Sequence, residues 1–401
     1  MLKNSNFIFW VFMLTLGVRL CAIFALGWHI RPDLWEYHDI ALNILNGHGY
    51  VYHHLNTDYL FYMSPFYSYW SALLYFLTDK NYLIIELAQV LVAGVSVIFL
   101  MKIARKIFNA RAAFICGLLY ALHPGLVIYT IKLHEFIFVS AFIIFLLYLI
   151  LNDGSAFMTG ILIGLALYVR VIFAFLIPAF FIYTMIKKGF KVSLVNTIVL
   201  ALLSVIIIVP WGYRGYKAYN RFLLRTDSAQ AFWQANSPTG SGSSLTKDNR
   251  PIVETIPEET KKKIFSLNEI GQYDFFRAQA ADYIKSRPLE FVKNTIKKFY
   301  YFWWFSPQVG LLYPLSWLLI YKVFYSFLAV TFTIGVYFIF KKRVDIDLAA
   351  IALVFSFILM ISALHSFVYV EVRHRWMIEP LLMIVSSYGI VSLLEDRGFK
   401  C

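Results

Sequence analysis

Three acidic residues, Asp33, Glu36 and Asp39, stand within seven positions of one another. A carboxylate held in place can accept a proton from a substrate hydroxyl as a bond forms, and a positioned base typically contributes roughly 10² to 10⁴ in rate. The alternative is a solvated helix face on which Asp33 caps the N-terminus, because Asp is favoured there and Pro32 precedes it. Both interpretations are compatible with the local pattern.

A second group consists of isolated charges beside or inside apolar stretches. A charge at the centre of a bilayer costs on the order of 2.5 to 3.5 kcal/mol, so such residues usually face a cavity or a partner. For each one, extension of the side chain to the membrane surface is the simpler alternative. Arginine presents a planar fork of donors that matches phosphate, so a group of arginines would suit an anionic lipid headgroup. These residues are Arg19, Lys132, Glu135, Arg170, Arg214, Arg373 and Arg375.

Metal-binding residues form no recognised signature. Five histidines fall near the same acidic and basic residues, namely His38, His53, His54, His134 and His365. A divalent cation held by some of them with Asp33 or Glu135 is conceivable, but no spacing matches a known metal motif. The sequence therefore predicts no certain cofactor. The three cysteines give no disulfide framework.

The composition places these residues in a membrane protein. Of 401 residues, 60% are apolar or aromatic and only 15% are charged, whereas an ordinary soluble domain is about 25% charged. A soluble globular enzyme is thereby excluded. The net charge of +13 is spread over short clusters between apolar stretches, which is typical of cytoplasmic loops. It forms no single basic face, so nucleic acid is not an expected partner.

Apolar stretches predict an all-α polytopic membrane protein with about ten transmembrane helices. A helix needs roughly 20 mostly apolar residues to cross a bilayer, or fewer where protein shields its ends. The predicted spans are residues 7–28, 82–101, 112–129, 136–151, 156–169, 171–186, 193–211, 313–340, 347–368 and 376–394.

The distribution of Lys and Arg predicts the orientation. With the N-terminus inside, thirteen basic residues of short loops fall on the cytoplasmic side and six outside. Residues 1–211 then form an N-terminal transmembrane module whose first outer loop is 29–81. Residues 212–312 form a second outer region, and 313–401 contain the C-terminal helices. All the isolated charges except Arg19 lie at outer ends of spans, on the same side as Asp33.

The outer segments themselves contain helical patterns. Apolar residues at Leu34, Tyr37, Ala41 and Leu45 predict an amphipathic surface helix that ends near Gly47. The aromatic stretch 65–77 is typical of an interfacial segment. A flexible stretch begins near residue 236, and a mixed-charge helical region is expected at 258–298.

Several motifs occur in the order found in one enzyme superfamily. From Asp33, "DLWEYHDIALNILNGHGY" resembles the first outer loop of GT-C glycosyltransferases, in particular family 39 relatives of protein O-mannosyltransferases and the lipid A aminoarabinose transferase. "SPFYSYW", "HPGLVIYTIKLHEFIF", "GLALYVR", "VPWGYRGY" and "EVRHRWMIEPLLMI" are similar to further elements of that family. The sequence departs from the family pattern at Ser64, His134, Gly215 and His374.

The resemblance implies an inverting transfer of a sugar from a polyprenyl-phosphate donor to a lipid, glycan or protein acceptor. It implies that Asp33 is the base, that Glu135 assists it, and that the active site faces the outside of the inner membrane. The substrate-binding residues would be Glu36, Tyr37, Lys132, Arg170, Arg214, Arg373 and Arg375. A flippase for lipid-linked sugars and a glycan polymerase or ligase that uses a diphosphate-linked donor are the alternatives.

Overall fold

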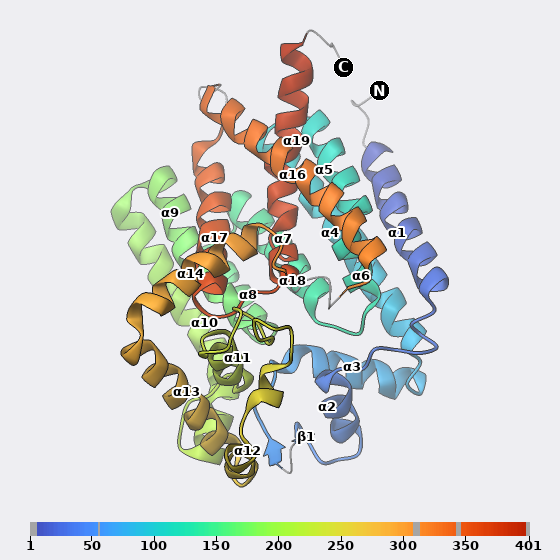
Figure 1. Cartoon of the computed structure of the whole chain (residues 1–401). Helices are drawn as coiled ribbons and strands as arrows, with labels where there is room; N and C mark the ends of the chain where they lie inside the picture. Colours follow the sequence, from blue (N-terminus) through green and yellow to red (C-terminus); the bar gives the residue numbers. More distant parts are fainter. Residues whose placement is uncertain (1–5, 55–56, 308–312, 342–345, 398–401) are drawn as a thin grey trace.

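The structure is a computed structural model that describes residues 6–54, 57–307, 313–341 and 346–397. Four basic residues counted for the orientation, Lys3, Lys342, Arg343 and Lys400, lie outside these ranges. The described residues form a bundle of long helices with a layer of shorter helices at one end (Figure 1). The predicted all-α polytopic fold is confirmed.

The long helices follow most of the predicted spans. Six helices of the described residues are long and apolar enough to cross a membrane, and a bent pair could supply a seventh. Two shorter apolar helices accompany them. The total of about ten spans remains a prediction. The bundle consists of α1 (Asn6–Leu26), α4 (Tyr82–Ile107), α5 (Ala110–Leu122), α6 (Pro124–Ile131), α7 (Phe136–Leu151), α8 (Ala156–Leu167), α9 (Leu176–Lys188), α10 (Phe190–Tyr219), α16 (Leu315–Lys341), α17 (Leu348–Phe367) and α19 (Glu379–Asp396).

The predicted span 112–129 is broken into α5 and α6, which meet at an angle of 54°. A proline disfavours helical backbone in the preceding residue, and His123 before Pro124 is extended, with φ −65° and ψ 114°. The His123 side chain accepts a hydrogen bond from the amide of Leu126 and so begins α6. After α6 the chain passes through a short turn, from Lys132 to Glu135, into α7.

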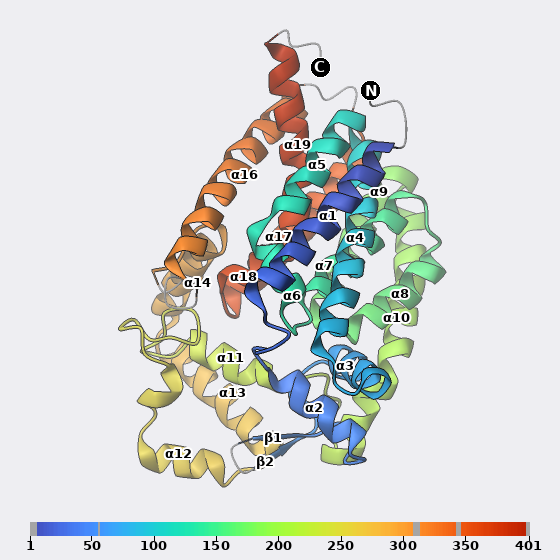
Figure 2. The same cartoon turned by 90° about the vertical axis from the view of Figure 1, so that its right-hand side faces the viewer.

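The shorter elements gather at the end of the bundle opposite the chain termini, which we call the outer end (Figure 1, Figure 2). From the first loop come α2 (Glu36–Leu45), the antiparallel strands β1 (Tyr52–His54) and β2 (Thr57–Tyr59), and α3 (Pro65–Thr78). From the later segment come α11 (Asp227–Ala235), α12 (Glu258–Phe265), α13 (Glu269–Ser286) and α14 (Pro288–Trp303). The short helices η1 (Val171–Phe175), η2 (Ile252–Thr255) and α18 (Val372–Trp376) complete the fold.

One buried carboxylate joins the two outer segments. Glu269, at the start of α13, accepts hydrogen bonds from the backbone amides of Leu60 and Phe61 at 2.7 and 2.9 Å. It also accepts from the hydroxyls of Tyr219 and Thr226. Because a buried charge is tolerated only when its hydrogen bonds are made, Glu269 fixes the first loop against the later segment.

Candidate active site

Side chains from four separate parts of the chain meet at the outer end of the bundle. The His134 ring contacts the rings of Trp35 and Tyr37, with centroids 5.1 and 5.5 Å apart. The Arg373 guanidinium lies 5.2 Å from the Trp35 ring centroid. We call this group the central cluster, and it consists of Trp35, Tyr37, His134, Glu135, Phe136, Arg170, Arg373 and His374.

Breaks in the helices position this cluster. Trp35 precedes α2, and His134 and Glu135 lie in the turn between α6 and α7. Arg170 stands between α8 and η1, in extended backbone. Arg373 is on α18, a single turn that follows α17. These residues thus lie in turns and short segments between helices, where the chain changes direction at the outer end.

Glu135 and Arg170 form an ion pair at the centre of the cluster. Their closest atoms, Arg170 Nη1 and Glu135 Oε1, are 3.3 Å apart, and the Glu135 side chain is only 1% exposed. The Arg170 guanidinium also lies 4.9 Å from the Phe136 ring centroid. The structure thus brings together two predicted site residues that are 35 positions apart in the sequence.

Several buried polar atoms of the cluster have no hydrogen-bond partner among the described residues. They include both carboxylate oxygens of Glu135, the Tyr37 hydroxyl and His134 Nδ1. Buried polar groups are nearly always hydrogen-bonded, so each exception calls for an explanation. Four such atoms in one cluster are the arrangement expected of a site that receives polar groups from a substrate or from water.

The two histidines of the cluster are neutral. Burial, reinforced by the positive charges of Arg373 and Arg170, lowers the pKa of His134 well below its ordinary value. Burial and the stacked ring of His365 lower the pKa of His374 in the same direction. The positive charge of the cluster therefore resides on its arginines.

Asp33 lies at the edge of this cluster and is open to solvent. Its Oδ2 is 2.8 Å from Lys132 Nζ, and its side chain is 54% exposed whereas that of Lys132 is 17% exposed. The alternative role of Asp33 as a helix N-cap is wrong, because α2 begins at Glu36 with Trp35 as its N-cap. Asp33 thus lies outside α2 and, along the chain, two residues before Trp35 of the central cluster.

The other two acids of the first loop differ in their surroundings. Asp39 is exposed. Glu36 is partly buried, its Oε2 has no hydrogen-bond partner among the described residues, and burial raises its pKa. The charges of Arg225 and Arg373 oppose that rise. Glu36 therefore faces the central cluster and Asp39 faces away from it.

Arg225 is a site residue that the sequence did not reveal. Its guanidinium binds both carboxylate oxygens of Asp227 and contacts Met63 Sδ at 3.2 Å. Burial works against its charged form, but Asp227 raises the pKa of Arg225 above its ordinary value. Its charge acts on Glu36 and on His134. Arg225 comes from the polar segment 212–312, where no apolar span marks an isolated charge as unusual.

Lys298 is a second buried cation in this region. Its Nζ donates to Asn236 Oδ1 and to the carbonyl of Phe367, each at 2.7 Å. Burial lowers the pKa of Lys298 to about 7. It ties α14 to the end of α17, just before α18.

Two predicted substrate-binding arginines are held elsewhere by the protein itself. Arg214 donates to the carbonyls of Leu60 and Tyr50 at 2.5 and 2.8 Å, so it fastens the first loop to α10. Arg375 is fully buried and donates through Nε, Nη1 and Nη2 to Glu379, the Phe302 carbonyl and the Tyr321 hydroxyl. Neither belongs to the central cluster.

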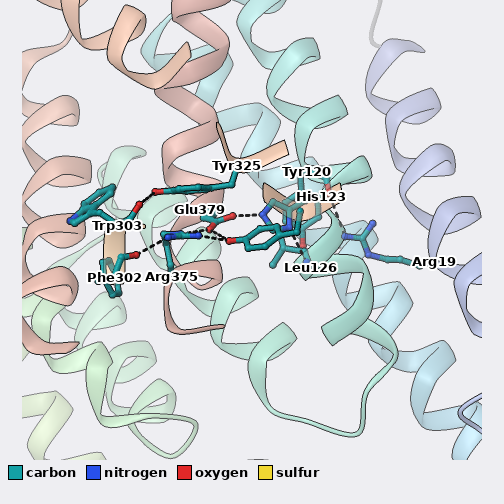
Figure 3. A network of polar contacts seen from close by, with 10 residues as sticks. Arg19, Tyr120, His123, Leu126, Phe302, Trp303, Tyr325, Arg375 and Glu379 are labelled. Carbon is teal, nitrogen blue, oxygen red and sulfur yellow. Dashed lines mark hydrogen bonds and ion pairs between the residues drawn. The ribbon is translucent and has the colours of Figure 1, made fainter. Parts of the chain in front are cut away.

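The Arg375 network runs through the core of the bundle (Figure 3). His123 pairs with the other oxygen of Glu379, and Tyr325 stacks on Arg375 with 3.4 Å between guanidinium carbon and ring centroid. Arg19 donates to Thr130 and to carbonyls at the end of α5. Arg19 connects α1 to α5 and α6, and Glu379 connects His123 at the start of α6 to Arg375 on α18. These buried contacts fix the helices whose outer ends carry the central cluster.

The residues do not fit a resident metal ion. In the ranges that the structure describes, no three or more His, Cys, Asp or Glu side chains gather to hold one. Glu135 faces Arg170 rather than another acid, and Asp33 faces Lys132.

Comparison with known proteins identifies the fold. Residues 63–213 match the sequence profile of the dolichyl-phosphate-mannose-protein mannosyltransferase family. No curated protein matches the chain. The apo oligosaccharyltransferase of Archaeoglobus fulgidus matches with TM-score 0.58 and 12% identity over 98% of this chain and 51% of that one.

Two further solved structures are similar. The Archaeoglobus fulgidus oligosaccharyltransferase AglB with an inhibitory peptide and a dolichol-phosphate has TM-score 0.53 and 12% identity, over 98% of this chain and 51% of that one. ArnT from Cupriavidus metallidurans bound to undecaprenyl phosphate has TM-score 0.44 and 16% identity, over 96% of this chain and 79% of that one.

The chain spans about half the length of the archaeal enzymes. The predicted resemblance is confirmed, since residues 63–213 match the dolichyl-phosphate-mannose-protein mannosyltransferase family in sequence and nearly the whole chain shares the fold of the archaeal oligosaccharyltransferase.

Proposed function

We propose that this protein is a membrane glycosyltransferase that moves a sugar from a polyprenyl-phosphate donor to an acceptor hydroxyl on the outer face of the membrane. One observation carries the proposal: a solvent-open carboxylate, Asp33, lies beside a buried cluster that contains Arg170 and Arg373, at the same end of the bundle. The archaeal relative of similar fold was solved with a dolichol-phosphate, which is also a lipid phosphate.

The proposed reaction is a single displacement. The acceptor oxygen attacks the anomeric carbon while Asp33 takes the hydroxyl proton. The bond between that carbon and the phosphate oxygen breaks, and polyprenyl phosphate leaves with the electron pair. Attack from the face opposite the leaving group inverts the anomeric configuration. Lys132 keeps the Asp33 carboxylate at the edge of the cluster, where an acceptor from solvent can reach it.

Arg170 and Arg373 are the proposed ligands of the phosphate, with Lys132 beside them. Donors that are already in place where negative charge develops are often the largest contribution to catalysis. Glu135 orients Arg170, and Glu371 orients Arg373 with 2.6 Å between carboxylate and Nε. Glu36 and the free hydroxyl of Tyr37 are available for hydroxyl groups of the sugar.

A small apolar void lies next to the cluster. Its walls include Phe136, Trp376 and Met377, and Arg170 Nη1 contacts Met377 Sδ at 3.6 Å.

The proposed orientation places both termini in the cytoplasm and the site on the periplasmic side of the inner membrane. This orientation rests on the excess of basic residues in the short loops at the end of the bundle where the two termini lie. A protein that only moved lipid-linked sugars across the membrane would need no exposed base beside its arginines.

Mass spectrometry of membrane lipids and surface glycans tests this function. Cells with and without the protein should differ by one sugar on one acceptor, and the released carrier should be the polyprenyl monophosphate. A released diphosphate would favour the polymerase or ligase alternative. Unchanged glycans, with the lipid-linked sugar displaced only between leaflets, would favour the flippase and refute the proposal.

A further inference from the structure

The last helix of the outer segment, α14, has an exposed apolar face. Leu289 is 76% exposed and Ile296 is 66% exposed, although both side chains are aliphatic. Exposed apolar side chains recur at every third or fourth position, so they form one stripe along the helix. The stripe, which is about 16 Å long at 1.5 Å per residue, consists of Leu289, Val292, Ile296, Phe299 and Tyr300.

A different face of α14 attaches it to the rest of the protein. Lys298 and Phe302 on that face are fully buried, and Lys298 Nζ donates to the carbonyl of Phe367 at the end of α17. Asn294 Nδ2 donates to the carbonyl of Ala235 at 3.0 Å. The helix is thus fixed without its exposed stripe, which remains available for a partner.

α14 crosses the outer end of α17, a helix long and apolar enough to span a membrane (Figure 1). Near the start of α14, the rings of Phe291 and Phe367 have centroids 5.2 Å apart. Near its end, Trp303 Nε1 donates to Ser362 Oγ at 2.7 Å. Phe291 and Trp303 are about 18 Å apart along α14, whereas Ser362 and Phe367 are about 8 Å apart along α17. α14 therefore runs obliquely across α17, at the level where that helix reaches the outer end of the bundle.

Two lysines lie beside the stripe. Lys293 and Lys297 are one helical turn apart, and both are exposed. The lysines that form ion pairs with carboxylates in the described part of the chain are others. Tyr301 and Trp303 follow in the next turn, and Tyr and Trp are enriched where a bilayer meets water.

We propose that the exposed face of α14 lies in the outer leaflet of the bilayer and that Lys293 and Lys297 bind the phosphates of anionic phospholipids. An exposed apolar stripe marks a protein or membrane partner, and a helix with lysines beside its apolar face is the form that lies in a membrane interface.

Two observations favour lipid over a second protein. The stripe continues the apolar surface of the spanning helix α17, on which Leu359 is 58% exposed. The adjacent lysines, which have no carboxylate partner among the described residues, complement an anionic lipid surface. This inference does not depend on the proposed function.

Fluorescence quenching of the full chain in nanodiscs tests the inference. A small fluorophore is attached to Ile296→Cys in a cysteine-free background, and the nanodiscs contain phosphatidylcholine and phosphatidylglycerol. Doxyl-labelled lipids should quench this fluorophore, and aqueous iodide should not. The controls are Leu359→Cys on α17, which should behave in the same way, and Lys262→Cys, an exposed position on α12 where iodide alone should quench.

The same labelled position measures the role of the lysines. Doxyl-phosphatidylglycerol should quench the fluorophore at position 296 more than doxyl-phosphatidylcholine does. That preference should fall roughly fivefold for each lysine removed, as expected for a cation near an anionic surface, in Lys293→Gln and Lys297→Gln. Lys262→Gln with Lys263→Gln is the matched control, because it removes two exposed lysines from α12, and it should leave the preference unchanged.

Three outcomes would overturn the inference. Quenching by iodide at position 296 would show that the face of α14 is open to water. Protection from both quenchers would show that a protein, such as a second copy of this chain, covers it. Equal quenching by the two doxyl lipids, or a preference that survives loss of both α14 lysines, would exclude the anionic headgroup as their ligand.

Discussion

Replacing Arg375 should unfold the protein rather than disable substrate binding. Arg375 and Glu379 are both fully buried, and their ion pair is 2.7 Å long. The arginine also donates to the Phe302 carbonyl and the Tyr321 hydroxyl, at 2.9 and 2.8 Å. Arg375→Ala would leave the Glu379 carboxylate buried with His123 and Tyr321 as its remaining partners.

The cost follows from this burial. Removal of one partner of a buried ion pair typically destabilises a protein by about 3 to 5 kcal/mol, because the other charge stays behind uncompensated. An exposed pair contributes about 0 to 1 kcal/mol. Arg111 and Glu395 form such a pair, with side chains 41% and 38% exposed. Arg111→Ala is therefore the matched control for loss of an arginine.

Thermal unfolding of the purified protein in one detergent measures the difference. Arg375→Ala should lower the unfolding temperature by several degrees or prevent recovery of folded protein, and Arg111→Ala should leave it nearly unchanged. Arg375→Met keeps the apolar length of the side chain, and its unfolding temperature should still be lower than that of the control Arg111→Ala. If Arg375→Ala unfolds at the wild-type temperature but loses lipid-phosphate binding, Arg375 belongs to the site and our interpretation of the network is wrong.

Three further predictions concern the site and the topology. Arg373→Ala should weaken binding of polyprenyl phosphate by about 1.5 to 3 kcal/mol, with partial rescue by Lys, which lacks the planar fork; unchanged binding in a titration would remove it from the phosphate site. Burial lowers the pKa of Lys298 to about 7, below roughly 10.4 for an unfolded lysine, so the unfolded chain binds more protons between these values. Stability should thus rise with pH across that window, and the rise should be smaller in Lys298→Met; equal slopes in pH-dependent unfolding would contradict this. In a cysteine-free background, Asp248→Cys should be labelled from outside and Lys188→Cys only from inside; labelling of both from one side would refute the topology.

The sequence predicted the bundle because its spans depend on local composition. An apolar stretch of about 20 residues dictates a helix in a bilayer whatever its neighbours are. The break at His123 was not predicted, although Pro124 marks its place, because a proline within an apolar stretch can also kink a continuous helix. The short helices 36–45 and 65–78 were expected from their periodicity and aromatic content.

The candidate site was predictable only where charge stood out from an apolar background. Glu135, Arg170 and Arg373 stand out in this way. Arg225 does not, because it lies in a polar segment and becomes part of the site only through folding. Arg375 shows the opposite problem, since an isolated arginine looks the same in the sequence whether it faces a substrate or the buried Glu379.

The proton-accepting role of Asp33 is the central claim, and one comparison tests it most directly. Cells that produce equal amounts of wild type, Asp33→Asn or Asp39→Asn would be compared by mass spectrometry of their lipids and surface glycans. Both substitutions remove one exposed carboxylate from the first loop. We predict that the sugar modification falls at least about a hundredfold in Asp33→Asn and is retained in Asp39→Asn. Normal modification in Asp33→Asn, with loss in Asp39→Asn, would contradict the account.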